Sequence, residues 1–265
     1  MLHVQKVHFI RYTVNGISMI ISIANQKGGV GKTTTAINLS AYLALQGKKT
    51  LLIDLDPQGA ATIGLGIDPW TLERTIYEVL IGKYKIGRVI STTQVNNLDL
   101  APANIQLSGA ELELAGQIGR ETILRQRLKD LEYDYIIIDT PPNLGLLTVN
   151  SLAACSRLII PLQTEYLPLV GTHLLFQVVD SVIERLGNKI DWKVLLTMLD
   201  KRRTTSKQIL EKAGERFKDR VFNATIPKNS PLSDAPSFGM PICLYDPKCP
   251  GAIAYEELTT EVLQW

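Results

Sequence analysis

Short apolar runs alternate along the chain with longer segments in which apolar residues recur at helical spacing. Seven runs predict strands, at residues 19–24, 49–56, 98–103, 133–142, 157–165, 192–199 and 221–227. Several of them are apolar at almost every position, which is typical of strands covered on both faces. Helical spacing is clearest at 35–47 and 171–187, and each segment ends in a glycine suited to a helix C-cap. The pattern predicts an α/β fold with a mostly parallel, doubly wound sheet and helices on both faces.

Composition adds the expectation of one ordinary globular domain. The 265 residues are 45% hydrophobic and 20% charged, and no internal repeat or Pro/Gly/Ser-rich linker divides them. We expect a single domain over residues 19–265. Residues 1–18 precede the first predicted strand and are interpreted as an N-terminal extension. An upstream start or a short extra strand is the simpler interpretation, and a partner-binding tail is the alternative.

The cysteines and the apolar runs bear on the expected location. Cys155, Cys243 and Cys249 are odd in number and lack Cys-x-x-Cys spacing, which argues against a disulfide framework and against that type of metal site. No apolar run reaches the roughly 18 to 20 residues of a membrane span. Residues 1–18 also lack the long apolar stretch of a signal peptide. We therefore expect a cytoplasmic protein.

A phosphate-binding loop is the most specific motif in the chain. Residues 23–40 read IANQKGGVGKTTTAINLS, between a predicted strand and a predicted helix. The usual loop is Gly, four residues, Gly-Lys-Ser/Thr, but here Gln26 occupies the place of the first glycine and Lys27 adds a second lysine. Glycines let successive N–H groups point inward at phosphates, and the helix N-terminus adds partial positive charge. A glycine-rich turn without a ligand is the alternative.

The loop has predicted roles for particular side chains. The nucleotide-binding residues expected in it are Gln26, Lys27, Gly28, Gly29, Val30, Gly31, Lys32, Thr33 and Thr34. Among them, Lys32 is expected to reach the β- and γ-phosphates, and the Thr33 hydroxyl is expected to ligate Mg²⁺.

Three aspartates follow apolar runs. Asp54 and Asp56 lie two residues apart at the end of one predicted strand, so their side chains point the same way, and Asp139 ends another. Carboxylates at the carboxyl edge of a parallel sheet are costly to bury unless they hold a cation or a water. Capping of a turn or helix is the alternative for each.

Four segments resemble one known family. KGGVGKTT resembles the deviant Walker A motif of the ParA/MinD family of ATPases, and LLIDLDPQGAAT resembles its second aspartate motif. YDYIIIDTPPNLG resembles its Walker B strand. PLSDAPSFGMPICLYDPKCPGAIAY resembles the C-terminal block of the chromosome- and plasmid-partitioning branch, the ParA/Soj type. The resemblance covers residues 19 to about 262 and implies a P-loop NTPase fold that binds ATP and Mg²⁺.

The resemblance also implies roles at the nucleotide. In that family two subunits sandwich two ATP molecules, which implies that Lys27 crosses to the nucleotide of the second subunit; a solvated loop lysine is the alternative. Asp56 orients the attacking water. Asp54 supports the magnesium and the loop, and Asp139 holds Mg²⁺ through water. In the family, the segment that corresponds to residues 225–229 closes over the base, which makes Pro227 and Asn229 candidates for adenine contacts.

Positive charge is concentrated near the C-terminal third. Residues 201–228 hold nine Lys or Arg against three Asp or Glu, a net +6, whereas the whole chain is +2. The pattern predicts a basic loop followed by a helix with Ile209, Leu210, Ala213 and Phe217 turned inward, and a solvated helix face is the alternative to a binding surface. The family resemblance implies non-specific DNA binding here, through Arg202, Arg203, Lys207 and Lys228. Pro231, Met240 and Pro250 stand where the family often has basic residues.

Together these features predict a slow, Mg²⁺-dependent ATPase that dimerises on ATP, binds DNA at the nucleoid and positions chromosomes, plasmids or other cargo with a ParB-like activator. A membrane-positioning ATPase of the MinD kind is one alternative, disfavoured because the C-terminal YEELTTEVLQW is acidic rather than basic. An iron–sulfur carrier of the same superfamily and a nucleotide-gated switch with little turnover are two others.

Overall fold

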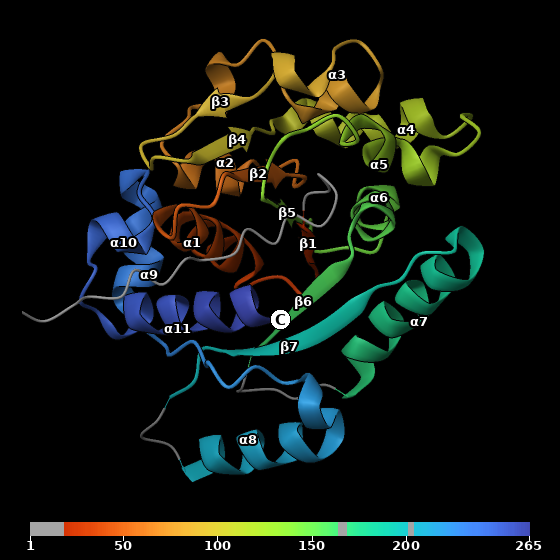
Figure 1. Cartoon of the computed structure of the whole chain (residues 1–265). Coiled ribbons are helices and arrows are strands. Elements are labelled where there is room, and N and C mark those ends of the chain that lie inside the picture. The colour runs from red at the N-terminus through yellow and green to blue at the C-terminus, as the bar shows by residue number, and fades with distance from the viewer. Residues whose placement is uncertain (1–18, 164–168, 201–203) are drawn as a thin grey trace, which may run out of the picture.

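A seven-stranded sheet forms the centre of the molecule (Figure 1). The computed structural model describes residues 19–163, 169–200 and 204–265. The strands are β1 (Met19–Ile23), β2 (Thr50–Asp54), β3 (Ser91–Thr92), β4 (Leu98–Ala101), β5 (Tyr135–Asp139), β6 (Arg157–Gln163) and β7 (Asp191–Thr197). Their order across the sheet is β3-β4-β2-β5-β1-β6-β7, and only β3 runs antiparallel to its neighbour. The predicted mostly parallel sheet is confirmed.

Helices cover both faces of the sheet. The α-helices are α1 (Lys32–Leu45), α2 (Ala60–Gly64), α3 (Ile76–Leu80), α4 (Ala110–Leu114), α5 (Ile123–Arg127), α6 (Leu146–Ala154), α7 (Leu169–Leu186), α8 (Thr204–Phe217), α9 (Ser230–Asp234), α10 (Ile242–Tyr245) and α11 (Pro250–Gln264). Short 3₁₀ turns are η1 (Pro69–Thr71), η2 (Ile86–Arg88), η3 (Ile105–Gly109), η4 (Arg120–Thr122), η5 (Lys218–Arg220) and η6 (Ala235–Phe238).

Alternation along the strands divides the core between the two faces. On β2, Leu52 packs in the cluster that contains α1 and α11, whereas Leu51 and Ile53 pack in the cluster of α3 to α6. Successive strand side chains point to opposite faces, so both faces of this strand must be apolar. Figure 1 shows α1, α9, α10 and α11 on one side of the sheet and α5, α6 and α7 on the other.

The strands predicted from the sequence differ from those of the structure at two places. Residues 221–227 make only isolated bridges to the sheet, at Val221 and Pro227. The segment keeps backbone hydrogen bonds to β7, but the amides of Asn223 and Ala224 donate to the Glu261 carboxylate on α11, at 3.0 and 2.6 Å, so the ladder with β7 is interrupted there. Conversely, β3 was not predicted, because two residues are too few to show a period.

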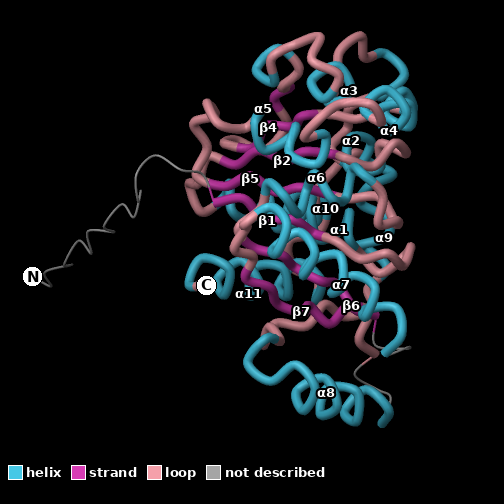
Figure 2. Tube along the Cα trace, turned by 90° about the vertical axis from the view of Figure 1, so that its right-hand side faces the viewer, coloured by secondary structure: helices cyan, strands magenta, loops and turns pink. Residues whose placement is uncertain are grey.

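The basic helix α8 lies at the β7 edge, apart from the other helices (Figure 2). Ala213 and Phe217 are buried, as expected, and Phe217 contacts the rings of Phe176 and Trp192. The expectation that Leu210 turns inward is wrong, since its side chain is 36% exposed. The side chain of Ile209 lies outside the described residues. Among the residues of α8 whose side chains are described, Ala213 and Phe217 form its buried face.

The two prolines noted in the sequence have local structural roles. Pro231 lies in the first turn of α9, and Pro250 is the first residue of α11. Proline fits there because its fixed φ suits the helix, and because an N–H in the first turn would have no partner within the helix.

Within the described part of the chain, no helix is long and apolar enough to cross a membrane.

Gly239 allows a close backbone contact with Gly66 that a residue with a Cβ at position 239 could not make. It has φ +64°, and a Cβ there would lie 2.5 Å from Gly66 Cα. We expect Gly239→Ala to lower the free energy of unfolding by roughly 2–5 kcal/mol, because a left-handed backbone and a steric clash both oppose it. Urea unfolding at 25 °C measures this.

The matched control is Gly187→Ala. Gly187 has the same φ of +64° but no atom within 4 Å of its Cβ position. The control should therefore show the backbone cost alone, about 1–2 kcal/mol. Equal losses in the two variants would contradict the importance of the Gly66 contact.

Candidate functional site

Residues 24–31 form a loop between β1 and α1 at the carboxyl edge of the sheet. Two side chains outside the glycine motif fix its start. The Asn25 amide donates to the Pro161 carbonyl at 2.8 Å and accepts from the Lys27 backbone at 3.0 Å. The Thr140 hydroxyl donates to the Ile23 carbonyl at 2.9 Å. Neither residue was identified from the sequence, although Asn25 directly follows an apolar run and Thr140 follows Asp139.

The loop glycines have the backbone that a phosphate cradle needs. Gly29 and Gly31 have φ of 71° and 90°, a region that residues with a Cβ rarely enter. Gly31 is the N-cap of α1, so the loop runs directly into the positive end of a 14-residue helix. A Cβ at Gly28 would touch Pro142, which follows β5. The loop backbone therefore has the turns that direct successive N–H groups to one side.

The two loop lysines lie in contrasting environments. Lys32 is only 6% exposed, and its Nζ donates to the Lys27 carbonyl at 3.1 Å. Burial lowers the pKa of Lys32, while Asp139 and Asp56 act in the opposite direction. The Lys27 side chain is exposed, and its Nζ donates to Gln163 Oε1 at 3.3 Å. The buried ammonium lies beside the loop's own site, and the exposed one lies at its outer surface.

Asp54 and Asp139 are paired in register on the neighbouring strands β2 and β5, and both are fully buried. The Asp54 oxygens accept from the Asp56 backbone at 3.1 Å and from the Thr62 backbone and hydroxyl at 2.9 and 2.8 Å. Burial raises the pKa of Asp54 to about 6, against the effect of these hydrogen bonds. Asp54 therefore holds the chain after β2, and its predicted support of magnesium stays a prediction.

Asp139 differs because neither of its oxygens has a hydrogen-bond partner among the described residues. Burial raises its pKa well above the usual range, and the Asp54 carboxylate adds to the rise. The Thr33 hydroxyl, close but outside hydrogen-bonding geometry, and the Lys32 ammonium act in the opposite direction. A buried carboxylate without a partner is what a cation site looks like before the cation binds.

These residues fit Mg²⁺ that is shared with a nucleotide. No group of three or more His, Cys, Asp or Glu able to hold a metal occurs among residues 19–163, 169–200 and 204–265. Mg²⁺ bound with a nucleotide needs only one or two protein ligands, because phosphates and waters complete its shell. Asp139 and the Thr33 hydroxyl can supply them.

Asp56 begins the turn that follows β2. Its side chain is half-buried, and Oδ1 accepts from the Gln58 backbone at 2.9 Å. The hydrogen bond from its own N–H to Asp54 fixes its backbone. One carboxylate oxygen is thus engaged, and the side chain lies near enough to Lys32 to raise the pKa of that lysine.

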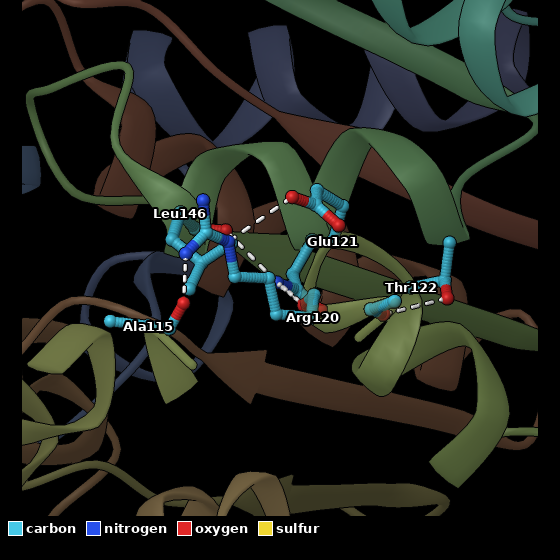
Figure 3. A network of polar contacts seen from close by, with 7 residues as sticks. Ala115, Arg120, Glu121, Thr122 and Leu146 are labelled. Carbon is cyan, nitrogen blue, oxygen red and sulfur yellow. Dashed lines mark hydrogen bonds and ion pairs between the residues drawn. The ribbon is translucent and has the colours of Figure 1, made fainter. Parts of the chain in front are cut away.

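A polar network supports the helix that follows the Asp139 loop. Asn150 of α6 donates to the carbonyls of Leu146 and Arg120, at 3.0 and 2.8 Å. Arg120 also contacts the Ala115 carbonyl and forms an ion pair with Glu121 (Figure 3). Segment 115–121 is therefore fastened to α6 through Arg120.

The predicted base-contacting residues lie beyond the end of β7. Pro227 bridges Leu199, and Asn229 precedes α9. The Asn229 Oδ1 is buried without a partner in the described part of the chain, and a Cβ at Gly251 would lie 2.8 Å from it. As placed, this oxygen points into the fold, so adenine contacts by both residues stay a prediction.

The predicted DNA-binding residues are only partly described. Arg202 and Arg203 lie outside the described residues, and Lys207 is in α8 without a described side chain. Lys228 is exposed. Arg220, also in the +6 segment, pairs with Asp191 at 3.4 Å and lies over Trp192. Part of the positive charge therefore serves the fold.

Comparisons with known proteins identify the family of this chain. The family model described as an AAA domain matches residues 18–192. Sporulation initiation inhibitor protein Soj of Bacillus subtilis (strain 168) is 49% identical over 92% of this chain and 97% of its own length. Chromosome-partitioning ATPase Soj of Treponema pallidum (strain Nichols) is 48% identical over 90% of this chain and 94% of its own. The chain belongs to the ParA/Soj family.

A solved structure extends the likeness of this ParA/Soj family member to the whole fold. Cobyrinic acid a,c-diamide synthase from Mycobacterium smegmatis, with bound ADP and magnesium, has a TM-score of 0.83 and 36% identity. The match covers 94% of this chain and 95% of that one. The predicted P-loop NTPase fold is confirmed.

The unpartnered carboxylate gives a stability prediction. We expect Asp139→Asn to raise the free energy of unfolding of the nucleotide-free protein by about 1–3 kcal/mol at pH 7.5, because a neutral amide is less costly to bury than this carboxylate. The same variant should lose the gain in nucleotide affinity that Mg²⁺ gives. Urea unfolding and titration with and without Mg²⁺ measure the two effects.

The control is Asp56→Asn. Asp56 is half-buried and hydrogen-bonded, so this variant should change stability by less than about 1 kcal/mol. A loss of stability in Asp139→Asn would mean that the carboxylate has a structural partner.

Proposed function

We propose that this protein is a Mg²⁺-dependent ATPase whose ATP-bound form is a dimer that binds DNA without sequence preference. With a ParB-like activator it positions chromosomes, plasmids or other cargo at the nucleoid. Its ParA/Soj family membership and the names of two relatives, a chromosome-partitioning ATPase Soj and a chromosome partitioning protein ParA, support this proposal. The structure of a neighbour with ADP and magnesium supports the cofactors.

The contrast between the two lysines of one loop carries the proposal. Lys32 is buried beside Asp139 and Asp56, where it neutralises phosphates of its own site. Lys27 is exposed, held at 3.3 Å by Gln163 on the outer side of the loop. A second cation at the outer side suits the nucleotide of a facing subunit. Cations supplied in trans to a phosphoryl-transfer site raise rates by about 10³ to 10⁵.

Each residue of the site then has a separate task in hydrolysis. The N–H groups of Gly28 to Thr33 and the Lys32 ammonium bind the phosphates, while Asp139 and Thr33 hold the metal. Bound Mg²⁺ supplies neutralisation of the phosphate charge. Asp56 orients the attacking water through the carboxylate oxygen that Gln58 does not engage. Asp54 acts indirectly, by positioning Asp56, because its carboxylate oxygens accept hydrogen bonds from the backbone of Asp56 and from Thr62.

Slow basal turnover follows if the site is incomplete in one subunit. A monomer lacks the trans cation, so hydrolysis waits for the dimer and for the activator that stabilises it.

DNA binding also depends on the dimer. One +6 segment makes few phosphate contacts, whereas two segments in one dimer double them and engage at high effective concentration.

Other functions have less support. Membrane positioning through a terminal amphipathic helix is disfavoured, because α11 buries Tyr255, Leu258 and Val262 in the core. An iron–sulfur role is disfavoured because Cys243 and Cys249 are buried and Cys249 accepts from the Ala252 amide at α11. Cobyrinic acid a,c-diamide synthesis has less support, because the neighbour named for it is 36% identical to this chain, whereas a Soj protein is 49% identical.

The dimer proposal gives a prediction for Lys27. We expect Lys27→Ala to bind ATP with nearly the parent's affinity but to stay monomeric with ATP and Mg²⁺, because the lysine's phosphate partner belongs to the other subunit. Light scattering and ATP titration check this. Lys32→Ala is the contrast, since it should lose ATP binding itself. A dimer of parental size in Lys27→Ala would return Lys27 to a solvated loop residue.

The DNA proposal is tested by sedimentation on plasmid DNA with ADP, ATP and a slowly hydrolysed ATP analogue. We expect ATP and the analogue, but not ADP, to promote binding. Arg202→Glu with Arg203→Glu should abolish DNA binding while leaving the ATP dimer intact. In variants that still bind DNA, each lost phosphate contact should make the slope of log K against log salt shallower by about 0.9.

The matched control carries the same change of charge elsewhere. Lys85→Glu with Arg88→Glu alters two exposed cations at η2, near α3 at the opposite end of the molecule from α8 (Figure 1). It should bind DNA nearly as the parent does. If both double variants bind equally, the +6 segment is a solvated face and DNA is not its partner.

A further inference from the structure

Thr197 joins the sheet edge to the phosphate loop. It is the last residue of β7, two strands away from β1, and it is 2% exposed. Its hydroxyl donates to the Val30 carbonyl at 2.8 Å. A Cβ at Gly31 would lie 3.8 Å from the Thr197 methyl group, so the side chain packs along the loop as well.

This hydrogen bond fixes the direction of a phosphate-binding N–H. In a trans peptide the C=O and the following N–H point in opposite directions. When Thr197 holds the Val30 carbonyl outward, the Gly31 N–H must point to the other side, into the cradle. Lys32 acts similarly at the loop's start, where its Nζ holds the Lys27 carbonyl.

The residues after Thr197 connect the loop to a third segment. Met198 has φ 55°, a left-handed backbone that a methionine adopts only when its surroundings impose it. This turn lets the Leu199 N–H donate to the Ile226 carbonyl at 3.0 Å and the Leu199 carbonyl accept from Lys228 at 3.1 Å. Three consecutive residues thus link the phosphate loop to segment 226–228.

We infer that Thr197 is a positioning residue for a nucleoside diphosphate, and that Thr197–Leu199 couples occupancy of the phosphate loop to segment 226–228. The inference rests on the proposed nucleotide binding. Segment 226–228 includes Pro227 and Lys228, so the coupling joins the phosphates to the predicted base and DNA contacts. It acts inside one subunit, independently of the dimer.

The first experiment measures ADP binding without Mg²⁺ by calorimetry. Thr197→Val keeps the shape and removes the hydroxyl, so we expect affinity about tenfold weaker, the size of one hydrogen bond. Thr197→Ser keeps the hydroxyl and should bind within about twofold of the parent. Thr259→Val is the matched control, because Thr259 is also buried and donates to a carbonyl, Tyr255, at 2.8 Å.

The outcomes separate the inference from the proposed function. Both valine variants should lower the melting temperature, but only Thr197→Val should weaken ADP binding. Parental affinity in Thr197→Val, or equal weakening in Thr259→Val, overturns the positioning role. Failure of the parent itself to bind ADP contradicts the proposed function instead.

The second experiment tests the coupling at saturating ADP, where affinity no longer matters. Hydrogen exchange of the Lys228 amide, which is bonded to Leu199, should slow on ADP binding in the parent and in Thr197→Ser. In Thr197→Val this gain in protection should fall by at least half. An equal gain in all three proteins shows that the loop and segment 226–228 are not coupled through Thr197.

Discussion

The parallel register of β2 and β5 places two buried carboxylates side by side, and the rest of the site depends on that placement. Asp54 and Asp139 face each other at the carboxyl edge, where neither reaches water. Two such charges repel and are costly to desolvate. The chain resolves the conflict unequally, because Asp54 receives three hydrogen bonds from its own loop while Asp139 receives none from the described residues. The remaining cost is what a metal ion can relieve.

The C-terminal block has a direct physical connection to this edge. Tyr255 on α11 shares a hydrogen bond of 3.1 Å with Thr35, and the Asn38 side chain accepts from the Ile242 amide at 2.7 Å while donating to the Thr34 carbonyl. These contacts hold the first turns of α1, directly after the phosphate loop. The family resemblance extends almost to the end of the chain because the C-terminal helices support the helix that carries Lys32 and Thr33.

The sequence was sufficient for the sheet, the loop and the three aspartates, because each depends on a short local pattern. It was insufficient where a distant group decides. Asn25, Thr140 and Thr197 act on carbonyls that only the strand order brings near. Residues 221–227 do not form a continuous strand, because Glu261, far along the chain, accepts the amides of Asn223 and Ala224. The helical period of α8 is real, but it does not show that Leu210 stays 36% exposed while Ala213 and Phe217 are buried.

The unusual loop sequence has a backbone explanation. In the described residues, the non-glycine positions with positive φ are Asn97, Met198 and Lys218, so Gln26 has an ordinary negative φ. The first glycine of the usual motif can therefore be replaced without strain. Lys27 occupies the first of the four variable positions, on the exposed side of the loop, while the left-handed turns at Gly29 and Gly31 keep their glycines. The loop thus gains an outward cation and keeps the N–H groups that bind phosphate.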